Sequence, residues 1–364
     1  MRIAHVVDSM EMGGAEMLVS QICRLQREQG HDPHVYAVAA LGALGERLQQ
    51  EGFVVEPNVG RHLPDSMRNF FNIFKKLQPD VVHLHNPTPT IYAAMPARMA
   101  GVKSIVSTRH SLVAPPHKMA VELKYALAAR FCDWIVGICD ATVDNLKSIR
   151  TIPERKIVRI YNGAAPVHRV TKEKWPRKIG FTLLYVGRLV PVKNHALLLN
   201  AFRVAHSSMP DLRLWMVGDG SERRALESLA AELSISEEVT FWGQRLDVAP
   251  FLSAADAFIM SSTSEGLPMS LLQAFSLGLP AIVTDVGGMA EVVQLTNSGF
   301  AVPATDQADM AAMMLRLASG DLERAQLSRN AETAFQSTFT LQSMADAYMA
   351  YYQDTPRIRH KSKA

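Results

Sequence analysis

The sequence predicts a chain of two doubly wound α/β domains. Three observations indicate this fold class: the length, an alternation of short apolar runs with helical periodicity, and one interruption of that alternation near residue 170. With 364 residues, the chain is about twice as long as an average domain. Hydrophobic residues make up 48% and charged residues 20%, which excludes a disordered chain, a coiled-coil rod and a collagen-like repeat. No apolar run approaches the roughly 20 residues that a transmembrane helix requires.

The first half alternates apolar runs of strand length with amphipathic stretches. The expected strands are Ile3–Val7, His34–Val38, Val81–Leu84, Ile105–Ser107 and Trp134–Val136. The clearest helices between them are Phe70–Leu77 and Met119–Phe131, in which apolar residues recur at helical spacing. Strands that are joined by crossover helices form a parallel sheet with helices on both faces.

The second half repeats this alternation after a polar, basic stretch that contains Pro176. Its expected strands are Thr182–Val186, Arg213–Val217, Val239–Trp242, Ala257–Met260 and Ala281–Thr284. We therefore expect a first domain at residues 1–168, a linker at 169–178 and a second domain at 179–340. A helix at about 340–355 can pack back on the first domain, and residues 356–364 form a basic, disordered tail. Ligands of such paired domains bind in the crevice at the carboxyl ends of the strands.

The formal net charge is only +3, but the charges are unevenly distributed. Residues 1–168 are net basic, residues 169–355 are net acidic, and the last nine residues hold four cations and no acid. This pattern indicates either different partners for the two domains or ordinary surface variation. We expect no nucleic-acid partner. Three widely spaced cysteines form no zinc or redox motif, so the reducing cytoplasm is the simplest location.

Glycines follow the first expected strand of each domain. Gly13 and Gly14 open a helix, where backbone N–H groups can bind an anion and the missing side chain admits a phosphate. A plain turn is the alternative, because the chain lacks the GxGxxG fingerprint of dinucleotide-binding domains. In the second domain, Gly187 precedes two cations, Arg188 and Lys193. At the mouth of a parallel sheet these cations can converge on one diphosphate, or they are solvated loop residues.

A carboxylate lies in the loop after the expected strand Ala257–Met260. Glu265 can bind sugar hydroxyls there, while the loop Gly266–Met269 and the start of the following helix, Ser270–Leu277, offer backbone N–H groups to a phosphate. Gln273 lies eight residues after Glu265, about two turns into this helix and facing the same crevice. A solvated glutamate in a turn is the alternative interpretation.

These elements, in this order, resemble those of the retaining nucleotide-sugar glycosyltransferases of the GT-B fold, glycosyltransferase family four. The matching segments are Gly13-Gly14-Ala15-Glu16, Val82-His83-Leu84-His85, Ser107-Thr108-Arg109-His110, Tyr161-Asn162-Gly163, Gly187-Arg188 with Lys193-Asn194, Val217-Gly218-Asp219-Gly220, Ser264-Glu265-Gly266-Leu267-Pro268 and Ala281–Gly288. They extend over the chain to about residue 350. The resemblance implies two Rossmann-like domains that face a central cleft and transfer a sugar from a nucleoside diphosphate sugar.

The resemblance assigns catalytic roles to four residues. Arg188 and Lys193 match the cation pair that holds the donor diphosphate and stabilises the departing nucleotide. Glu265 matches the first glutamate of the E-x7-E motif, which binds donor-sugar hydroxyls near the anomeric carbon. His110 matches a histidine that reaches the donor sugar across the cleft.

The resemblance also implies a set of donor-binding residues. Gly14 matches backbone that approaches the donor phosphate and sugar, and Gly243-Gln244-Arg245 matches the loop that cradles the nucleobase. The expected donor-binding residues are Gly13, Gly14, Gly187, Gly218, Arg245, Gly266, Leu267, Pro268, Met269 and Gln273.

Gln273 departs from the family pattern, in which the second glutamate of E-x7-E receives hydrogen bonds from the ribose hydroxyls. The amide oxygen of Gln273 can accept one such bond, but without the negative charge that strengthens it. We expect weaker nucleotide binding or an altered nucleotide choice, with activity retained because the two cations and Glu265 are present.

We therefore expect a retaining, metal-independent hexosyltransferase that needs no cofactor and prefers a UDP-sugar over a GDP-sugar. Its acceptor is a saccharide or a lipid-linked hydroxyl, as in the synthesis of a cell-surface glycan or glycolipid. Other interpretations stay open. His83 and His85 point to the same face of their strand, as in the metal half-site of a hydrolase. A protein that binds a nucleotide sugar without catalysis is a second alternative, and phosphorolysis or epimerisation on the same fold is a third.

We also expect peripheral attachment of the first domain to an anionic surface at the cytoplasmic face of a membrane. Basic and bulky apolar residues are interleaved in two of its helices, as is typical of contact with anionic lipid. These residues are Lys118, Leu123, Lys124, Tyr125, Leu127, Arg130 and Phe131 in one helix and Phe70–Lys76 in the other. The alternative is that the apolar side chains pack against the sheet.

Overall fold

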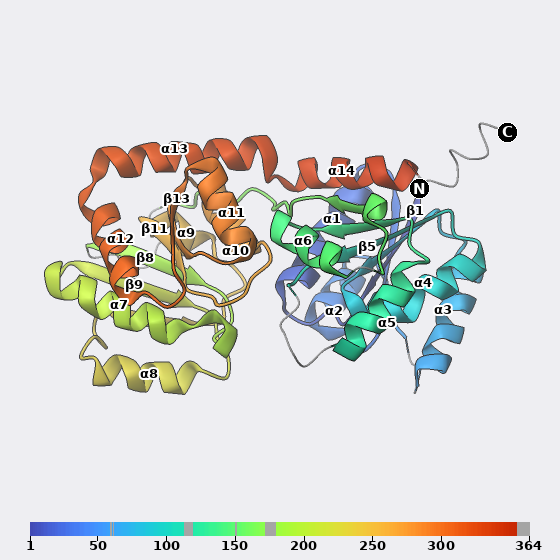
Figure 1. Cartoon of the computed structure of the whole chain (residues 1–364), viewed down its shortest axis with the longest axis horizontal. Helices are drawn as coiled ribbons and strands as arrows, with labels where there is room; N and C mark the ends of the chain where they lie inside the picture. The colour runs from blue at the N-terminus through green and yellow to red at the C-terminus, as the bar shows by residue number, and fades with distance from the viewer. Residues whose placement is uncertain (59, 61, 113–118, 150, 172–179, 355–364) are drawn as a thin grey trace. The chain divides into compact units, whose positions relative to one another are not determined.

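The structure is a computed structural model that describes residues 1–364 except 59, 61, 113–118, 150, 172–179 and 355–364. The chain forms two compact units, unit 1 (Met1–Gly163 with Leu341–Ala364) and unit 2 (Ala164–Thr340). Each unit is built on one parallel sheet surrounded by helices (Figure 1). The predicted α/β fold class with two doubly wound domains is confirmed.

Unit 1 contains a seven-stranded sheet with the strand order β3-β2-β1-β4-β5-β6-β7. Its strands are β1 (Arg2–Val7), β2 (Asp32–Ala37), β3 (Val54–Pro57), β4 (Val81–His85), β5 (Ser104–Arg109), β6 (Trp134–Gly137) and β7 (Ile157–Arg159). All neighbouring strands are parallel. The central strands are buried on both faces, as the fully buried side chains of Ile3, Val6 and Val82 show, because helices cover both sides of the sheet.

The helices of unit 1 connect successive strands of this sheet, except α14 (Leu341–Gln353), which follows the last helix of unit 2. The others are α1 (Gly14–Glu28), α2 (Gly42–Gln50), α3 (Leu63–Leu77), α4 (Pro87–Ala100), α5 (Met119–Ala129), α6 (Asp140–Ser148) and the short helix η1 (Glu154–Lys156). Helix α1 buries Leu18 and Ile22, which lie on one face because they are four residues apart.

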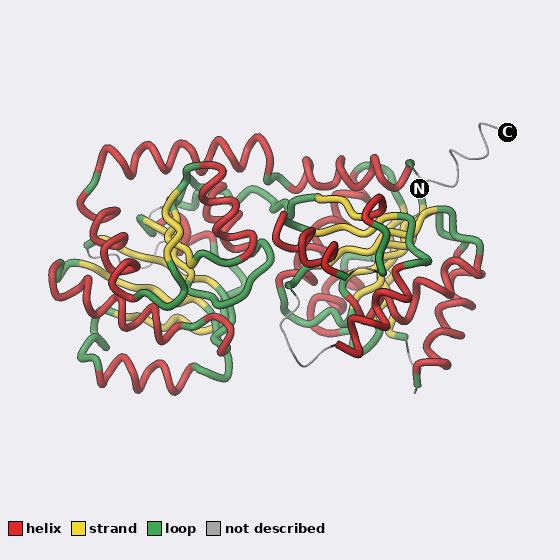
Figure 2. The backbone as a smooth tube through the Cα atoms, in the orientation of Figure 1, coloured by secondary structure: helices red, strands yellow, loops and turns green. Residues whose placement is uncertain are grey.

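Unit 2 contains a six-stranded sheet with the strand order β10-β9-β8-β11-β12-β13, again parallel throughout. Its strands are β8 (Phe181–Val186), β9 (Leu212–Val217), β10 (Val239–Gly243), β11 (Ala257–Met260), β12 (Ala281–Thr284) and β13 (Gly299–Val302). Its helices are η3 (Pro191–Lys193), α7 (His195–Ser208), α8 (Arg223–Glu232), α9 (Ala249–Ala254), α10 (Met269–Ser276), α11 (Gly287–Thr296), α12 (Gln307–Ser319) and α13 (Asp321–Thr338). Figure 2 shows the strands inside each unit and the helices outside.

The strand order of each sheet reverses at one point. In unit 1 the chain proceeds from β1 to β2 on one side and to β4 on the other. In unit 2 it proceeds from β8 to β9 on one side and to β11 on the other. Ligands of open parallel sheets bind at the carboxyl ends of the strands beside such a reversal. The loops that follow β1, β4, β8 and β11 are therefore the places to look for the site.

The last helix, α14, belongs to unit 1 and packs on α1 (Figure 1). It buries Met344, Tyr348 and Tyr352. The hydroxyl of Tyr352 is hydrogen-bonded to Nδ1 of His83 over 2.6 Å, and the indole N–H of Trp134 donates to the carbonyl of Asp354 over 2.6 Å. The end of the chain thus completes the packing of the unit in which the chain begins.

Some predicted boundaries differ from the structure. Unit 2 begins at Ala164, whereas the first domain is expected to extend to residue 168 and the second to begin at 179. The N–H of Ala164 donates to the Phe339 carbonyl over 2.9 Å, and the N–H of Val167 donates to the Ser276 hydroxyl over 3.1 Å. The strands β3 and β13 are not among the expected strands; each has four residues, of which only one is buried. Most of the expected linker and the basic tail lie outside the described residues.

The structure corrects part of the expected membrane surface. Phe70, Phe74 and Tyr125 are fully buried in the core of unit 1, because α3 and α5 turn these side chains toward the rest of the unit. Among the same helices, Leu123 and Leu127 stay more than half exposed, at 59% and 52%. No helix within the described residues is long and apolar enough to cross a bilayer.

Candidate active site

Two loops of unit 2 meet at the reversal of its strand order. One follows β8 and contains Gly187 to Asn194, and the other follows β11 and contains Ser261 to Pro268. The hydroxyl of Ser261 donates to the Lys193 carbonyl over 2.9 Å, and the N–H of Thr263 donates to the Val192 carbonyl over 2.9 Å. These bonds fasten the two loops together at the carboxyl edge of the sheet.

Lys193 and Glu265 form an ion pair between these loops. Their side chains are only 14% and 15% exposed, so both charges are largely removed from water. The Ser262 hydroxyl donates a second hydrogen bond to the Glu265 carboxylate over 3.0 Å. The structure therefore brings together two of the four predicted catalytic residues, whose opposite charges are paired.

Arg188 lies on the same loop as Lys193 but is exposed. Within the described part of the chain, its guanidinium has no hydrogen-bond or ion-pair partner, while its carbonyl accepts a bond from the Tyr185 hydroxyl over 3.0 Å. The Arg188 guanidinium can therefore bind an anionic ligand without breaking an existing ion pair.

Two predicted glycines of this site have a structural role. Gly218 has a φ of +143°, and a Cβ atom placed on it would lie 1.8 Å from the Gly187 carbonyl oxygen. A Cβ atom on Gly187 would lie 2.6 Å from the Tyr185 hydroxyl. Only glycine lets the ends of β8 and β9 approach so closely.

The loop Gly266–Met269 leads into α10, whose N-cap is Pro268. The Gly266 carbonyl accepts a bond from the N–H of Gly288 over 2.9 Å, and Leu267 is buried, so the loop is held firmly. Gln273 is half-buried on α10. It lies about one turn into this helix, which begins at Met269, and not the expected two turns.

The predicted nucleobase loop follows β10 and borders an open hollow of about 550 Å³. Its lining residues are Trp242, Gln244, Arg245, Leu246, Asp247, Pro250 and Phe251. The rings of Trp242 and Phe251 pack edge to face with their centroids 5.1 Å apart. Nε1 of Trp242 is buried and has no hydrogen-bond partner among the described residues. Aromatic rings beside polar side chains line this hollow, and such a lining can hold a planar heterocycle.

The predicted residues of unit 1 lie at its own reversal of strand order. Gly13 is the N-cap of α1 after β1, and Gly14 is exposed with open space where a Cβ atom would lie. His110 follows β5, and its backbone N–H donates to the Asn86 side chain over 3.0 Å. Nε2 of His110 lies 3.0 Å from Nδ1 of His85. Burial lowers the pKa of His110 to about 4, so its ring is neutral at physiological pH.

Models of two protein families match the chain, one for each half. The model described as Glycosyltransferase Family 4 matches residues 12–166, and the model described as Glycosyl transferases group 1 matches residues 170–334. Together they extend over most of the chain.

The chain belongs to the group 1, family 4 glycosyltransferases.

Two relatives of the chain are glycosyltransferases by name, and one solved structure has the same fold. The UDP-Gal:alpha-D-GlcNAc-diphosphoundecaprenol alpha-1,3-galactosyltransferase of Escherichia coli is 29% identical over 260 residues, which are 66% of this chain and 67% of that protein. The O-antigen biosynthesis glycosyltransferase WbnH of Escherichia coli is 25% identical over 310 residues, 84% of this chain and 86% of that protein. The crystal structure of Anabaena HepE in complex with UDP superposes with a TM-score of 0.82 at 19% identity, over 96% of this chain and 99% of that one.

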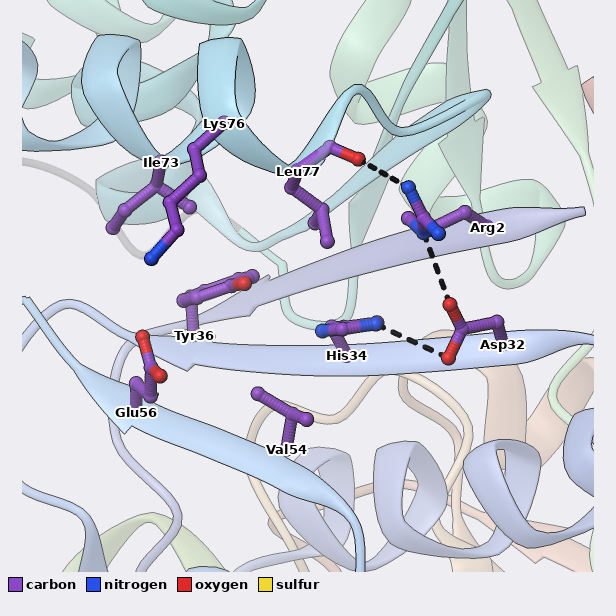
Figure 3. A pocket seen from close by; sticks show the side chains of 9 residues that line it. All are labelled: Arg2, Asp32, His34, Tyr36, Val54, Glu56, Ile73, Lys76 and Leu77. Carbon is purple, nitrogen blue, oxygen red and sulfur yellow. Dashed lines mark hydrogen bonds and ion pairs between the residues drawn. The ribbon is translucent and has the colours of Figure 1, made fainter.

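This glycosyltransferase has a second hollow, of about 350 Å³, on the sheet of unit 1 (Figure 3). None of the predicted site residues lines it. Two of its charged side chains, Arg2 and Asp32, are paired with each other. Asp32 accepts bonds from Arg2 over 3.0 Å and from His34 over 3.1 Å, and Arg2 also donates to the Leu77 carbonyl. Since Arg2 and Asp32 begin their strands, this part of the hollow lies away from the carboxyl edge of the sheet.

Two buried polar residues of this glycosyltransferase, which hydrogen bonds link to His110, were not predicted from the sequence. His5 lies within the apolar run of β1, and Gln26 lies on the buried face of α1. Both are buried almost completely, at 0% and 1% exposure. A histidine inside an otherwise apolar strand could have been noticed, because a buried polar side chain needs a partner. No sequence pattern indicates that its partners lie on β4 and α1.

Proposed function

We propose that the protein transfers a sugar from a nucleoside diphosphate sugar to an acceptor hydroxyl, with retention of the anomeric configuration and without a metal ion. The observation that favours this most is the pairing of Lys193 with Glu265 at the strand reversal of unit 2, on the loop that also presents Arg188. The cation can bind the diphosphate of a nucleoside diphosphate sugar, and the carboxylate beside it can bind hydroxyls of the adjoining sugar ring.

The chemistry follows from these charges. When the bond between the anomeric carbon and the diphosphate oxygen breaks, negative charge develops on the leaving diphosphate. Arg188 and Lys193 stabilise that charge, and preorganised cations in a partly desolvated site do so effectively. Glu265 accepts hydrogen bonds from sugar hydroxyls. The acceptor oxygen bonds to the anomeric carbon on the face that the diphosphate leaves, and the departing phosphate oxygen takes the acceptor proton.

For the nucleotide we propose a UDP-sugar in preference to a GDP-sugar. The hollow at Trp242 and Arg245 takes the base, and Gln273 accepts a hydrogen bond from the ribose. A UDP-sugar is named for the galactosyltransferase relative, and UDP is bound in the HepE structure, which supports this choice. For the acceptor we propose a saccharide or lipid-linked hydroxyl, in keeping with the diphosphoundecaprenol acceptor named for that relative.

The test is an assay of purified protein with UDP-glucose, UDP-galactose, UDP-N-acetylglucosamine and GDP-mannose, with and without lipid-linked acceptors. Without an acceptor, we expect slow hydrolysis of one UDP-sugar. With a suitable acceptor, we expect fast transfer of the sugar. Proton NMR of the product should show that the α or β configuration of the donor is retained. Inverted product would overturn the retaining mechanism. Binding of a nucleotide sugar with no turnover under any condition would favour the non-catalytic alternative.

We also propose that unit 1 binds an anionic membrane surface through α4 and α5, which pack on each other. Helix α4 exposes Met95 and Met99, and α5 exposes Leu123 and Leu127, each pair four residues apart and so on one face of its helix. Lys124 and Arg130 are exposed on or beside α5. Apolar side chains that enter the interface beside cations that attract anionic lipid give reversible binding.

Flotation with vesicles of phosphatidylglycerol and phosphatidylethanolamine tests this surface. We expect the protein to float at low salt, and the double variant Leu123→Ser/Leu127→Ser to bind about tenfold more weakly. The control is Leu322→Ser, since Leu322 of unit 2 is 90% exposed and lies on a different helix. Equal flotation of all three proteins, or none, would refute the assignment to α4 and α5.

A further inference from the structure

Unit 1 contains a cluster of four histidines beneath its carboxyl edge. His5 comes from β1, His83 and His85 come from β4, and His110 follows β5. The rings of His83 and His85 have centroids only 4.0 Å apart, and His5 and His83 are fully buried. So many polar rings in a core need a complete set of hydrogen bonds, since each unpaired buried nitrogen is costly.

Three of these histidines form a single line of hydrogen bonds that starts at Gln26. Oε1 of Gln26 lies 2.9 Å from Nε2 of His5, and Nδ1 of His5 lies 3.1 Å from Nε2 of His85. Nδ1 of His85 then lies 3.0 Å from Nε2 of His110. The line ends at Nδ1 of His110, which is buried and has no partner among the described residues.

His83 lies on a side branch that reaches the line at Gln26, through the Tyr352 hydroxyl. Its Nδ1 is bonded to the Tyr352 hydroxyl over 2.6 Å, and its Nε2 is bonded to the Thr108 hydroxyl over 2.7 Å. Neither bond involves His110 or His85. His83 therefore shares the burial and the strand of His85 without belonging to the line.

The rings in this line are neutral. Burial lowers the pKa of His5 and of His110 to about 4, and it lowers the pKa of His85 well below its ordinary value. A neutral imidazole has one N–H donor and one bare nitrogen acceptor, so one bond in the line determines the next. The Gln26 oxygen can only accept, so Nε2 of His5 carries the proton and Nδ1 of His5 is bare.

The same reasoning continues to the end of the line. Bare Nδ1 of His5 accepts from Nε2–H of His85, and bare Nδ1 of His85 accepts from Nε2–H of His110. Nδ1 of His110 is then an acceptor that lacks a donor. A buried acceptor without a partner in a folded protein calls for a ligand that supplies the missing hydrogen.

We propose that Gln26, His5 and His85 are positioning residues that hold His110 in its Nε2–H tautomer, so that Nδ1 of His110 is a fixed acceptor for a hydroxyl of the sugar. This inference rests on the proposed function and on the role that the family resemblance implies for His110, contact with the donor sugar. A fixed acceptor cannot donate a proton to the leaving group, and it discriminates against a sugar that lacks the matching hydroxyl, because Nδ1 then stays unpaired.

The rival use of the cluster is a metal site. Nitrogen atoms of His5, His83 and His85 lie within 4.8 Å of one another, which is close enough for a shared ion. Every ring nitrogen of these three histidines is already hydrogen-bonded, however, and a metal would have to replace several of those bonds. The hydrogen-bonded line satisfies the cluster without any ion, so we favour it and treat a metal as an outcome of the test.

The direct test is nitrogen-15 NMR of the full-length protein with labelled histidine, because protonated and bare ring nitrogens have distinct chemical shifts. The His110 signals are assigned by their loss in His110→Asn. We expect one tautomer of His110, protonated at Nε2, from pH 8 to pH 6. A His110 ring protonated at Nδ1, or an equal mixture of tautomers, would overturn the proposal.

Variants of two histidines on β4 distinguish a positioning role from a packing role. His85→Leu removes the acceptor for Nε2–H of His110, and we expect a mixture of His110 tautomers. His85→Asn retains an oxygen near the position of Nδ1 and should restore the single tautomer. The matched control is His83→Leu, which removes a buried histidine from the same strand and should leave the His110 signals unchanged. An equal effect of His83→Leu and His85→Leu would refute the line.

A second set of measurements covers a failure to fold and the metal alternative. If His85→Leu does not fold, Gln26→Leu removes the acceptor at the far end of the line and should also produce a tautomer mixture at His110.

Metal analysis of the purified protein should find no stoichiometric ion. Bound zinc whose removal by EDTA shifts the histidine signals would overturn the line in favour of a metal site.

Activity supplies the readout that distinguishes this inference from the proposed function. In His85→Leu, we expect the donor KM to rise about tenfold while calorimetry shows unchanged binding of UDP, which lacks the sugar. A changed tautomer with unchanged kinetics would leave the line intact and refute the contact of His110 with the sugar. An unchanged tautomer with impaired kinetics would refute the line instead.

Discussion

Replacement of Lys193 by methionine should damage both catalysis and stability. The Lys193 side chain is 14% exposed and pairs with Glu265, which is 15% exposed. Methionine keeps the length of the stem but leaves the Glu265 carboxylate with one fewer charged partner in a largely desolvated place. The loss of a charge-assisted hydrogen bond of this kind costs about 1.5–3 kcal/mol of folding free energy. Loss of one group that stabilises the leaving diphosphate should also lower kcat by roughly 10²–10³.

Arg188→Met is the matched comparison. It removes a cation from the same loop, but the Arg188 side chain is exposed and has no ion-pair partner within the described residues. We therefore expect a similar loss of kcat with no measurable loss of stability. For a domain of the size of unit 2, each kcal/mol shifts Tm by about 2–4 °C, so Lys193→Met should melt about 3–12 °C lower and Arg188→Met should melt like the wild type.

The two assays are turnover of a UDP-sugar and thermal unfolding followed by circular dichroism. Equal melting temperatures for the wild type and Lys193→Met would show that the ion pair contributes nothing to stability. Near-normal turnover in both variants would remove diphosphate stabilisation by these cations from the mechanism. A low melting temperature in Arg188→Met would mean that its side chain is not free, contrary to the structure.

Three further predictions concern the nucleotide, metal ions and pH. Gln273→Glu should tighten binding of UDP or GDP by about 1 kcal/mol, because a charged acceptor strengthens the hydrogen bond to the ribose; calorimetry that finds unchanged or weaker binding of both would mean that this side chain does not reach the ribose. Turnover should persist in excess EDTA, and a complete loss that added metal reverses would contradict the metal-independent mechanism. Unit 1 should lose stability as the pH falls, because burial lowers the pKa of His5 and His110 to about 4 in the folded state, whereas the unfolded chain takes up protons near pH 6.5. Between pH 7.5 and 5.5 each such histidine should cost about 1.4 kcal/mol, and a melting temperature of unit 1 that does not change over this range would refute the assignment of neutral, buried rings.

Local sequence patterns were sufficient for the elements and for the family. Apolar runs such as Ile3–Val7 and Val81–Leu84 form buried central strands, and helical spacing of apolar residues marks α1 and α10. The patterns did not predict strands that are short and only partly buried, such as β3. Periodicity reports which residues alternate between core and solvent, and it reports nothing about which distant side chains come into contact.

The two-domain α/β architecture, the family and the residue types at the expected site are predictable from the amino-acid sequence. The contacts among these residues are visible only in the folded chain. Lys193 and Glu265 are 72 positions apart and His5 and His85 are 80 apart, and each pair meets because its strands are neighbours in the sheet. The same holds for Phe70 and Tyr125, whose neighbours in the sequence indicated a membrane surface but whose burial depends on how α3 and α5 pack. Strand order and helix packing result from the summed burial of the whole unit, so no local window of the sequence contains them.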